Sequence, residues 1–465
     1  MFRIANHHVS RITSILLLIE FSISLVSVYF GAMIRDVDHE LPFSSSSNSF
    51  FQTACVFAFA VVFSMSALGM YQINFREGIR NTFLRLMPSF AMALILITLV
   101  FYVLPTLYIG RGMLGIVLVI AAIGILVARV LIFKTSQSGV LRSRIIFLGS
   151  GAIAKECCEL ALSNSAHHEY EILGFMPVSD EDCQVVNVNF FPANTRLSTL
   201  AEKYNADEIV VAVQNRRGSQ FPIDDLLECK LSGVRVIDAA AFFEREACQI
   251  RVESLQPGWL VFGDGFNQNF LRRIIKQIFD LFVSAIIFLL ASPVMLITTC
   301  LIYLEDRGPI LYKQERVGKD GRTYMVLKFR SMGTNAERAG NPQWATTNDP
   351  RVTRVGKIIR KLRIDELPQI LNVLKGEMSF VGPRPERPFF VDQLCKDVPF
   401  YNLRHSIKPG ITGMAQVRYA YGASVEDSLQ KLQYDLYYVK NNSLFLDVLI
   451  LLETVQVVLL GKGAR

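Results

Sequence analysis

Residues 279–304 read FDLFVSAIIFLLASPVMLITTCLIYL, an apolar run broken by Asp280 and by the dipeptide Ser292-Pro293. About 20 apolar residues in a helix cross a bilayer, so the run is long enough to span one. Proline removes a helix hydrogen bond and kinks the chain, and serine can satisfy the freed carbonyl. The run therefore forms one of two structures. It is either a kinked spanning helix, which would carry the C-terminal third out of the cell, or a re-entrant helix that returns to the side it entered.

Four further apolar runs fill the first third of the chain. They are Ile12–Ile34, Phe51–Phe75, Leu86–Ile109 and Met113–Phe133. Each reaches the length that crosses a bilayer, and only Glu20 and Arg129 place a charge inside them. We expect a four-helix transmembrane bundle in residues 1–135, with these two charges pairing inside it or reaching toward the headgroups. A cleaved signal peptide is the alternative for the first run, but that run is long and no clear cleavage site follows it.

Lysine and arginine in the connections predict the orientation of these helices. The N-terminal flank, the second connection and the segment after the fourth run are basic, whereas the first connection is acidic and the third carries only Arg111. Both ends of the bundle, and everything after residue 135, are therefore expected in the cytoplasm. The 48 Lys and Arg against 41 Asp and Glu give a net charge of +7, which suits contact with anionic lipid or phosphate and does not indicate nucleic acid.

A parallel α/β module is predicted for residues 136–265. Strand-like segments recur at residues 144–148, 171–176, 208–213 and 234–238, with helical stretches between them. The turn after the first segment holds Gly149, Gly151 and Ala154 in the pattern G-x-G-x-x-A, which permits close approach of a phosphate to a helix N-terminus. No acidic residue ends the second segment, as a dinucleotide site would require. The pattern favours a Rossmann-like fold and leaves open whether the module is structural, regulatory or nucleotide-binding.

Two adjacent acids surrounded by cations mark the last third of the chain. The sequence DELPQ at residues 365–369 begins a predicted helix that Gly376 would end, with Asp365 as its capping residue. The cations that are candidate phosphate ligands are Arg316, Lys328, Arg330, Arg354, Arg360, Arg384 and Lys408. Arginine pairs with phosphate oxygens, Mg²⁺ takes one or two carboxylates together with phosphate, and a carboxylate can attack phosphorus. Asp365 and Glu366 thus suit catalysis on a phosphate substrate with bound Mg²⁺.

Five ordered motifs follow one another in this third. They are KFRSM at 328–332, DELPQ at 365–369, GPRP at 382–385, KPGITG at 408–413 and YDLYY at 434–438. On these motifs, the chain from about Arg272 to its C-terminus resembles the bacterial sugar transferase family, the polyprenyl-phosphate glycosyl-1-phosphate transferases. The four spans and the Rossmann-like module ahead of the motifs resemble the large exopolysaccharide-initiating members of that family.

The resemblance implies an activity. Such enzymes move a sugar-1-phosphate from a UDP-sugar to undecaprenyl phosphate and release UMP, as the first membrane step of exopolysaccharide or capsule synthesis. Asp365 would be the nucleophile and form a covalent aspartyl intermediate, with Glu366 assisting beside it. Mg²⁺ would bind at this acidic pair, and Arg360 and Arg384 would hold phosphates.

The resemblance also implies a topology and partners. A re-entrant helix broken at Ser292 and Pro293 would hold a mostly α catalytic domain, residues 266–465, on the cytoplasmic side of the bacterial inner membrane. There the domain would meet a soluble UDP-sugar, undecaprenyl phosphate and inner-membrane lipid. The whole chain is then expected to be a multi-domain, multi-pass membrane protein. The sequence leaves open which sugar is transferred and whether the protein forms a homodimer.

Two other functions stay open at this stage. A membrane-anchored nucleotide-sugar dehydratase or dehydrogenase could use residues 149–154, but it would also need a Tyr-x-x-x-Lys pair on a helix. The match at Tyr324 and Lys328 lies in a segment that alternates like a strand, which would separate the two side chains by about 13 Å. A non-enzymatic scaffold for polysaccharide assembly is the other alternative.

Overall fold

The computed structural model describes most of the chain. The described residues are 2–4, 7–9, 11–36, 47–71, 78–137, 142–163, 170–178, 183–185, 188–192, 195–213, 221–252, 265–266, 269–333, 351–419, 422 and 424–459. The chain divides into two compact units, one formed by residues 1–3 and 8–247 and the other by residues 4–7 and 248–465.

Long helices in the first unit match the four apolar runs of the sequence. Two short strands, β1 (Phe2–Ile4) and β2 (His7–Val9), precede them in the chain. The helices are α1 (Arg11–Asp36), α2 (Ser47–Ala67), α3 (Gly78–Val103) and α4 (Arg111–Gln137). Each contains a stretch long and apolar enough to cross a membrane, as the sequence predicts. The third helix ends earlier than expected, because Pro105 starts a separate 3-10 turn, η2 (Pro105–Leu107).

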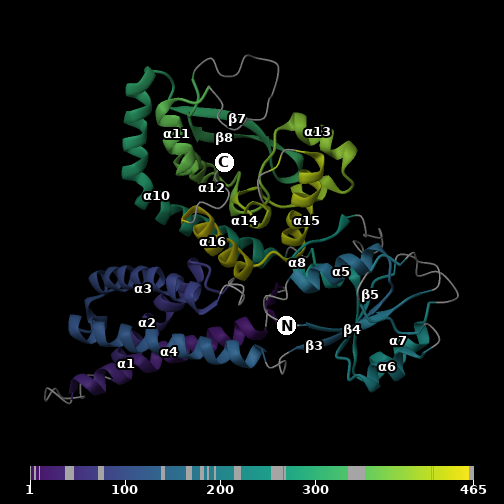
Figure 1. Ribbon diagram of the computed structural model, residues 1–465. Coiled ribbons are helices and arrows are strands. Elements are labelled where there is room, and N and C mark those ends of the chain that lie inside the picture. Colours follow the sequence, from purple (N-terminus) through teal and green to yellow (C-terminus); the bar gives the residue numbers. More distant parts are fainter. Residues whose placement is uncertain are drawn as a thin grey trace. The chain divides into compact units, whose positions relative to one another are not determined.

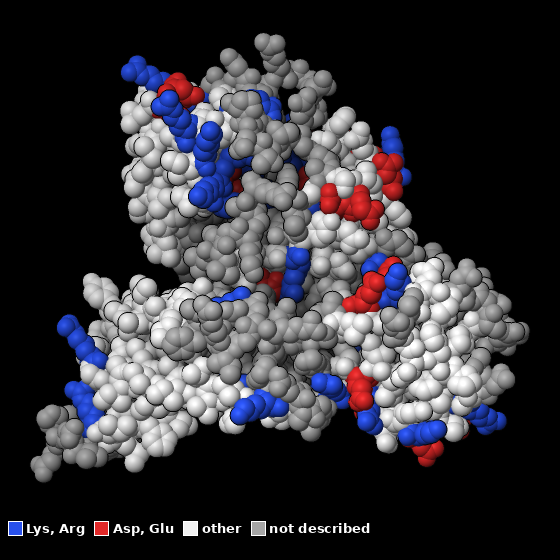
Figure 2. Space-filling model, viewed as in Figure 1, with Lys and Arg blue, Asp and Glu red and all other residues white. Residues whose placement is uncertain are grey.

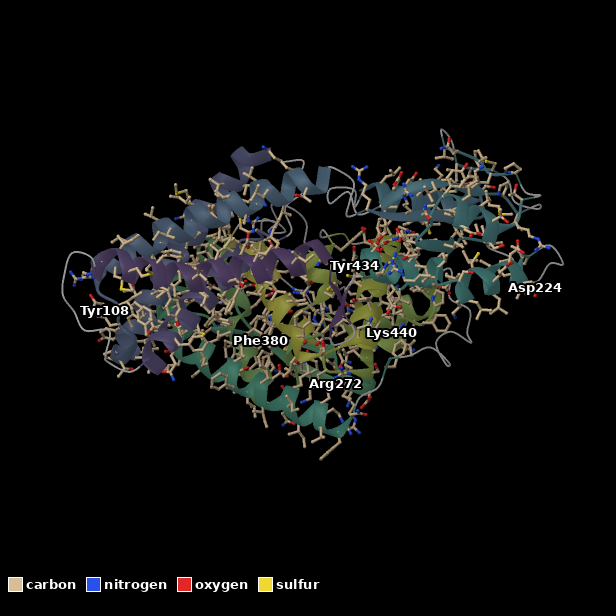
Figure 3. The ribbon with its side chains drawn as sticks, turned by 90° about the horizontal axis from the view of Figure 1, so that it is seen from below. Tyr108, Asp224, Arg272, Phe380, Tyr434 and Lys440 are labelled. Atoms are coloured by element: carbon tan, nitrogen blue, oxygen red, sulfur yellow. The ribbon has the colours of Figure 1, made fainter. Side chains whose placement is uncertain are left out.

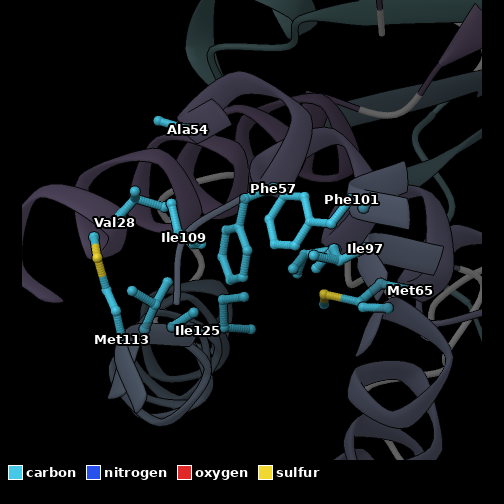
Figure 4. Close-up of a cluster of buried hydrophobic side chains, with 14 of the residues drawn as sticks. Val28, Ala54, Phe57, Met65, Ile97, Phe101, Ile109, Met113 and Ile125 are labelled. Carbon is cyan, nitrogen blue, oxygen red and sulfur yellow. The ribbon is translucent and has the colours of Figure 1, made fainter. Parts of the chain in front are cut away.

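These four helices share one hydrophobic cluster. Phe57 of α2, Phe101 of α3 and Ile125 of α4 are buried members of it (Figure 4). Glycines allow α1 and α4 to approach closely: a Cβ on Gly124 would lie 2.7 Å from Ile23 Cγ2. Small residues at such contacts let helix backbones approach closely and so increase van der Waals packing. In a lipid bilayer this packing holds apolar helices together, because the lipid is as apolar as the side chains.

The two charges inside the apolar helices pair with each other. Arg129 Nε donates to Glu20 Oε1 at 2.6 Å, and its Nη2 donates to Oε2 at 3.2 Å. The Tyr71 hydroxyl donates to Glu20 at 2.7 Å, and Arg129 also donates to the Met70 carbonyl at 3.1 Å. Both charged side chains are buried, so the pairing supplies the partners that water would otherwise provide. It ties α1 to α4 and to the chain after α2, which confirms the expected pairing.

Residues 143–247 form an α/β module in the same unit. Its elements are β3 (Ser143–Leu148), α5 (Ala152–Ser163), β4 (Tyr170–Met176), α6 (Leu197–Lys203), β5 (Glu208–Val211), α7 (Ile223–Leu231), β6 (Arg235–Asp238) and α8 (Ala239–Ala247). The strands are parallel in the order β4-β3-β5-β6 and lie where the sequence predicts strands. Phe147 of β3 belongs to a core shared with α5 and α8, whereas the adjacent Ile146 belongs to a core shared with α6 and α7. Helices thus cover both faces of the sheet, as in a Rossmann-like fold.

The second unit is a mixed α/β structure. Its helices are α10 (Phe270–Asp306), α11 (Arg354–Lys361), α12 (Ile370–Leu374), α13 (Pro388–Asp397), α14 (Met414–Arg418), α15 (Val425–Asn441) and α16 (Leu444–Leu459). Short 3-10 turns are η5 (Lys319–Gly321), η6 (Ile364–Gln369) and η7 (Tyr401–Ser406). Its strands are β7 (Leu311–Val317), β8 (Thr323–Phe329), β9 (Ser379–Val381) and β10 (Gly410–Thr412). An antiparallel β7–β8 pair and a parallel β9–β10 pair accompany the helices, so the expectation of a mostly α domain is only partly met.

A buried apolar core holds the second unit together. Leu436 and Tyr437 of α15, Leu446 and Ile450 of α16, and Phe380 of β9 are buried in one cluster. Figure 3 shows Phe380 among these C-terminal helices, which are drawn in yellow. The core fixes β9 in place, and the chain leaving β9 is the turn at residues 382–385 that carries Arg384.

The apolar run that contains Ser292 and Pro293 forms one long helix, α10, of 37 residues. Pro293 has no N–H, so the carbonyl of Leu289, four residues earlier, lacks its usual helical donor. Ser292 Oγ donates to this carbonyl instead, at 2.8 Å. The helix does not run straight: its ribbon changes direction within its length (Figure 1). It is also long and apolar enough to cross a membrane.

Both halves of α10 are attached to the remainder of the second unit. In the first half, Lys276 pairs with Asp447 of α16 at 2.8 Å, and Asp280 accepts from Ser379 Oγ at 2.7 Å and from the Phe380 N–H at 3.1 Å. At the far end, Glu305 accepts from the Arg354 N–H at the start of α11 at 2.8 Å. These polar contacts anchor both halves of the helix to one folded unit.

Candidate active site

Asp365 and Glu366 lie in the first turn of η6, between α11 and α12. The prediction that Asp365 caps an α-helix is wrong, because this segment forms a 3-10 turn and α12 begins only at Ile370. Arg363 immediately before the turn adopts a left-handed conformation with φ of 58°, which redirects the chain after α11. The expected helix end is confirmed, since Gly376 follows α12 with φ of 81°.

Glu366 is held by cations from three parts of the chain. Its Oε1 accepts from Arg384 Nη2 at 2.8 Å and from Lys328 Nζ at 3.2 Å, and Arg363 Nη1 lies 3.9 Å away. Burial by itself would raise the pKa of this carboxyl, but Arg384 and Lys328 outweigh burial and hold the pKa well below its usual range. Glu366 therefore favours its ionised form and anchors two cationic side chains.

Asp365 has the opposite environment. Its Oδ1 is buried and has no hydrogen-bond partner among the residues that the structure describes. Burial, together with the negative charge of Glu366, raises the pKa of the Asp365 carboxyl, and the charges of Lys328, Arg363 and Arg360 only partly offset this. Two adjacent carboxyl groups with pKa values pushed apart are typical of catalytic sites that assign them different roles. The Asp365 residue as a whole is only partly buried, so its carboxylate is suited to bind a metal ion or to attack an electrophile.

A buried amide that the sequence analysis missed, Asn372, positions Lys328. Asn372 Oδ1 accepts from the Leu327 N–H at 3.1 Å, and its Nδ2 donates to the Met325 carbonyl at 2.8 Å and to Glu377 at 2.7 Å. These bonds join α12 to strand β8, which carries Lys328. Asn372 stands inside the apolar run ILNVL, and a polar residue at the centre of such a run was the available signal, because buried amides are almost always hydrogen-bonded.

The GPRP and KPGITG motifs form one piece of structure. The Gly382 N–H donates to the Thr412 carbonyl at 2.9 Å, and the Gly410 N–H donates to the Pro383 carbonyl at 2.9 Å. A Cβ on Gly382 would lie 2.9 Å from Gly410 N, and a Cβ on Gly410 would overlap the Gly382 backbone. The two glycines are thus required by the contact between two backbones, and this contact places Arg384 opposite η6.

The structure brings together only part of the predicted phosphate ligands. Lys328 and Arg384 contact Glu366, and Arg360 contributes positive charge at Asp365. Arg316 lies next to this group: it donates to the Pro385 carbonyl at 3.1 Å and to Glu386 at 3.3 Å. Burial, followed by the charges of Arg384 and Arg387, lowers the pKa of Arg316.

The other predicted phosphate ligands lie in different surroundings. The Arg330 guanidinium is buried and pairs with Asp306 at the end of α10. Arg354 is exposed at the start of α11, and Lys408 lies beside Gly376, since a Cβ built on that glycine would be 3.6 Å from Lys408 Nζ. None of these three makes a contact with Asp365 or Glu366 among the hydrogen bonds and ion pairs of the described residues.

Exposed cations gather around α11 in the same unit. Arg354, Lys357, Lys361 and Arg363 are exposed there, and Figure 2 shows Lys and Arg clustered over this helix. A group of like charges produces a positive potential that attracts anions. The approach to Asp365 is therefore favourable for a phosphate-bearing molecule.

The fit of Mg²⁺ to this site can be judged from the two carboxyl groups. In the part of the chain that the structure describes, no three His, Cys, Asp or Glu side chains gather into a metal-binding group. Mg²⁺ in phosphoryl-transfer sites commonly takes only one or two carboxylates, with phosphate and water completing its shell. Asp365 fits this role through its unpartnered Oδ1, whereas Glu366 already has cationic partners.

The glycine turn of the α/β module has the predicted strand–turn–helix context. Gly149 has φ of 114°, and a Cβ there would lie 2.5 Å from the Ala212 carbonyl oxygen, so glycine is needed for packing of the turn against the end of β5. Ala154 is fully buried in the module core, and Gly151 directly precedes α5. Tyr324 and Lys328 both lie on strand β8, as expected, and therefore do not form the helical pair that a dehydratase needs.

Comparison with known proteins identifies the second unit. The family described as bacterial sugar transferase matches residues 271–461. Over 240 residues the chain is 45% identical to a UDP-N-acetylgalactosamine-undecaprenyl-phosphate N-acetylgalactosaminephosphotransferase of Aeromonas hydrophila, covering 52% of this chain and 56% of that protein. Over 198 residues it is 40% identical to a UDP-glucose:undecaprenyl-phosphate glucose-1-phosphate transferase of Klebsiella pneumoniae, covering 42% of each. The chain thus spans about half the length of these two relatives.

A third relative extends the similarity over most of the chain. Over 368 residues the chain is 30% identical to an undecaprenyl-phosphate galactose phosphotransferase of Salmonella typhimurium, covering 71% of each. This similarity reaches well beyond the matched domain, which confirms the resemblance seen in the five motifs. The chain belongs to the bacterial sugar transferase family.

Proposed function

We propose that the protein transfers a sugar-1-phosphate from a UDP-sugar to undecaprenyl phosphate, releasing UMP, as the first membrane step of exopolysaccharide or capsule synthesis. One observation carries this proposal: Asp365, whose Oδ1 has no hydrogen-bond partner among the described residues, lies beside Glu366, which Lys328 and Arg384 hold. This arrangement offers a nucleophile next to cations that suit a diphosphate. The three relatives are named as transferases of this kind, each for a different sugar.

In the proposed reaction, Asp365 acts as the nucleophile. Its carboxylate oxygen attacks the phosphorus that bears the sugar, a P–Oδ bond forms, and the bond from that phosphorus to the bridging oxygen breaks, so that UMP leaves with the electron pair. An oxygen of undecaprenyl phosphate then attacks the same phosphorus and releases the Asp365 carboxylate. The product is the undecaprenyl diphosphate sugar. The raised pKa supports this role, because a more basic carboxylate is a stronger nucleophile once it is ionised.

The cations around Glu366 suit the charge of the substrate. Arg384 and Lys328 are oriented by Glu366 and would present their remaining N–H groups to phosphate oxygens. Orientation in advance matters, because a side chain that is already fixed loses less entropy when the substrate binds. Mg²⁺, bound at Asp365, would supply further neutralisation of the diphosphate charge.

The contacts of α10 support a re-entrant rather than a spanning helix. A spanning helix would place its two ends on opposite sides of the bilayer. Here Asp280 in the first half and Glu305 at the far end both bind residues of one folded unit. We therefore propose that α10 enters and leaves on the cytoplasmic side of the bacterial inner membrane, with its bend at Ser292-Pro293. The catalytic unit would then lie at the level where the lipid acceptor carries its phosphate.

The decisive experiment measures UMP release by the purified full-length protein with undecaprenyl phosphate, Mg²⁺ and a panel of UDP-sugars. The panel should include the UDP forms of N-acetylgalactosamine, glucose and galactose, the sugars in the relatives' names. We expect release with one sugar in particular, and a loss of at least roughly 10³-fold in Asp365→Asn, as for removal of a covalent nucleophile.

A matched control uses another aspartate of the same unit. Asp392 is exposed on α13, so Asp392→Asn should release UMP at the wild-type rate. Absence of UMP release from folded wild-type protein across the panel would contradict the proposed transferase and favour a scaffolding role. UMP release that persists in Asp365→Asn would exclude the aspartyl intermediate.

A further inference from the structure

The fifth sequence motif, YDLYY at residues 434–438, lies on α15, and none of its residues is among the described hydrogen-bond and ion-pair partners of Glu366. Its aspartate, Asp435, is nevertheless only 1% exposed, which is rare for a carboxylate. Its Oδ2 forms an ion pair with Arg404 Nη2 at 2.7 Å. A buried carboxylate of this kind needs a reason, because taking it out of water is unfavourable unless it is paired.

Arg404, in η7, connects Asp435 to the turn that carries Arg384. The same Nη2 that pairs with Asp435 donates to the carbonyl oxygen of Arg384 at 2.9 Å. The guanidinium is buried, its Nη1 donates to the Tyr401 hydroxyl, and its centre lies 5.0 Å from the ring of Tyr401. Asp435 and Tyr401 thus fix the Arg404 guanidinium, and its Nη2 also holds the main chain of Arg384.

The turn around Arg384 depends on donors from outside. Pro383 and Pro385 flank Arg384 and have no N–H, so neither can take part in a local hydrogen bond as a donor. Two arginines supply donors instead: Arg404 binds the carbonyl of Arg384, and Arg316 binds the carbonyl of Pro385 at 3.1 Å. The direction of the Arg384 side chain follows from the orientation of this backbone, and that side chain reaches Glu366 at 2.8 Å.

We infer that Arg404, held by Asp435, is a positioning residue for the transfer reaction: it orients the backbone of Arg384 so that the Arg384 guanidinium meets Glu366. The chain of contacts runs from α15 through η7 to the GPRP turn and ends at the acidic pair. This inference rests on the proposed function. The YDLYY motif, although far from Glu366 in the sequence, would thus help to position Arg384 through Asp435 and Arg404.

Lysine cannot replace Arg404 in this arrangement. The rigid, planar guanidinium directs Nη2 at the carboxylate and the Arg384 carbonyl while Nη1 binds the Tyr401 hydroxyl, whereas an ammonium group has all its donors on one atom at the end of a flexible stem. Arg404→Lys keeps the positive charge beside Asp435 and should still fold. It should lose the contact with the Arg384 carbonyl, and a displacement of about 1 Å at a catalytic group lowers the rate by up to roughly 10²-fold.

The test is a double-mutant cycle on UMP release with Arg404→Lys, Arg384→Lys and the double variant. We expect a fall in kcat of roughly 10- to 100-fold for Arg404→Lys with a smaller change in KM, because a positioning defect acts on the transition state. The double variant should be no slower than Arg384→Lys alone, since Arg404 acts through Arg384. Losses that multiply in the double variant would overturn the inference.

Two further arms keep the test decisive. Asp435→Asn, which frees Arg404 from its partner, should give a partial loss that also disappears in the Arg384→Lys background. Arg418→Lys is the matched control. Arg418 Nε pairs with Glu453 at 3.0 Å in the same unit, and no hydrogen bond or ion pair among the described residues joins Arg418 to the GPRP turn, so its replacement should leave kcat unchanged. A fall in kcat for Arg418→Lys equal to that of Arg404→Lys would indicate a general loss of stability instead.

The same cycle measured by thermal unfolding does not depend on turnover. If Arg404 supports the contact between Arg384 and Glu366, the loss of stability caused by Arg384→Lys should be smaller when residue 404 is already lysine. An inactive wild type would therefore contradict the proposed function alone. Stability losses that simply add would contradict the positioning role alone.

Discussion

Arg384 Nη2 donates to Glu366 Oε1 at 2.8 Å, and this contact separates the chemistry of two adjacent carboxyl groups. The positive charges of Arg384 and Lys328 lower the pKa of Glu366 and so favour its ionised form. Asp365, one residue earlier, has an unpartnered oxygen and a raised pKa. The site therefore has one carboxylate that organises cations and one that is available for reaction.

The pH dependence of UMP release should report Asp365. Only the ionised carboxylate attacks phosphorus, so the rate should fall as the pH drops through the raised pKa of Asp365. Glu366→Gln removes a neighbouring negative charge that raises this pKa and leaves Lys328 and Arg384 free to stabilise ionised Asp365. The acid limb of kcat/KM should therefore move to lower pH. Asp392→Asn on α13 is the control, and an acid limb that stays in place in Glu366→Gln would contradict the electrostatic assignment.

Replacement of Asn372 should destabilise the unit and lower activity. Asn372→Ala removes three hydrogen bonds and leaves the Leu327 N–H without its acceptor. We expect a loss of about 1–3 kcal/mol in the free energy of unfolding, together with slower UMP release because strand β8 carries Lys328. Asn402 is exposed on η7, and Asn402→Ala should change stability by no more than about 0.5 kcal/mol. Equal melting temperatures for the two variants would contradict the role of Asn372 in joining α12 to β8.

The topology of α10 can be read by thiol labelling. With the 8 native cysteines replaced, single cysteines at Phe270, Arg307 and Tyr108 report the two ends of α10 and the connection before α4 (Figure 3 labels Tyr108). In right-side-out spheroplasts an impermeant reagent should label only the cysteine at Tyr108, which is 55% exposed. The other two should react only in inverted vesicles. Labelling of Arg307→Cys from outside would show that α10 spans the membrane.

The pH dependence of stability should report Asp435. Burial, opposed by the charge of Arg404, raises the pKa of this carboxyl to about 6. Between the pKa of Asp435 in the unfolded chain and about pH 6, the folded state holds a proton on Asp435 that the unfolded chain has lost. The stabilisation from this proton is therefore fully present below the unfolded pKa and is lost as the pH rises through about 6. Asp435→Asn lacks this titration. This variant should melt at a lower temperature than the wild type, and the gap between the two melting temperatures should narrow as the pH rises from about 4 to about 7. A gap that does not change with pH would contradict the raised pKa of Asp435.

Local patterns in the sequence were sufficient for much of the architecture. Four long apolar runs predicted four helices, and alternating strand-like and helical segments predicted the parallel sheet of the α/β module. Both signals depend on residues close together in the chain. The same holds for the KFRSM strand, where Lys328 lies on β8 as expected. The five motifs also predicted the family correctly.

The organisation of the site was decided by tertiary structure. Asp365 looked like a helix cap, because an acid before a proline-containing turn usually is one. The chain instead forms a 3-10 turn there, and Asp365 Oδ1 has no hydrogen-bond partner among the described residues. Of the seven cations predicted to bind phosphate, only packing could separate Lys328 and Arg384 at Glu366 from Arg330 at Asp306. The sequence by itself determined which residue types are present and the local structure that carries them. Which charges meet was determined by the fold alone, because hydrogen bonds and ion pairs act over a few ångströms in space whatever the separation along the chain.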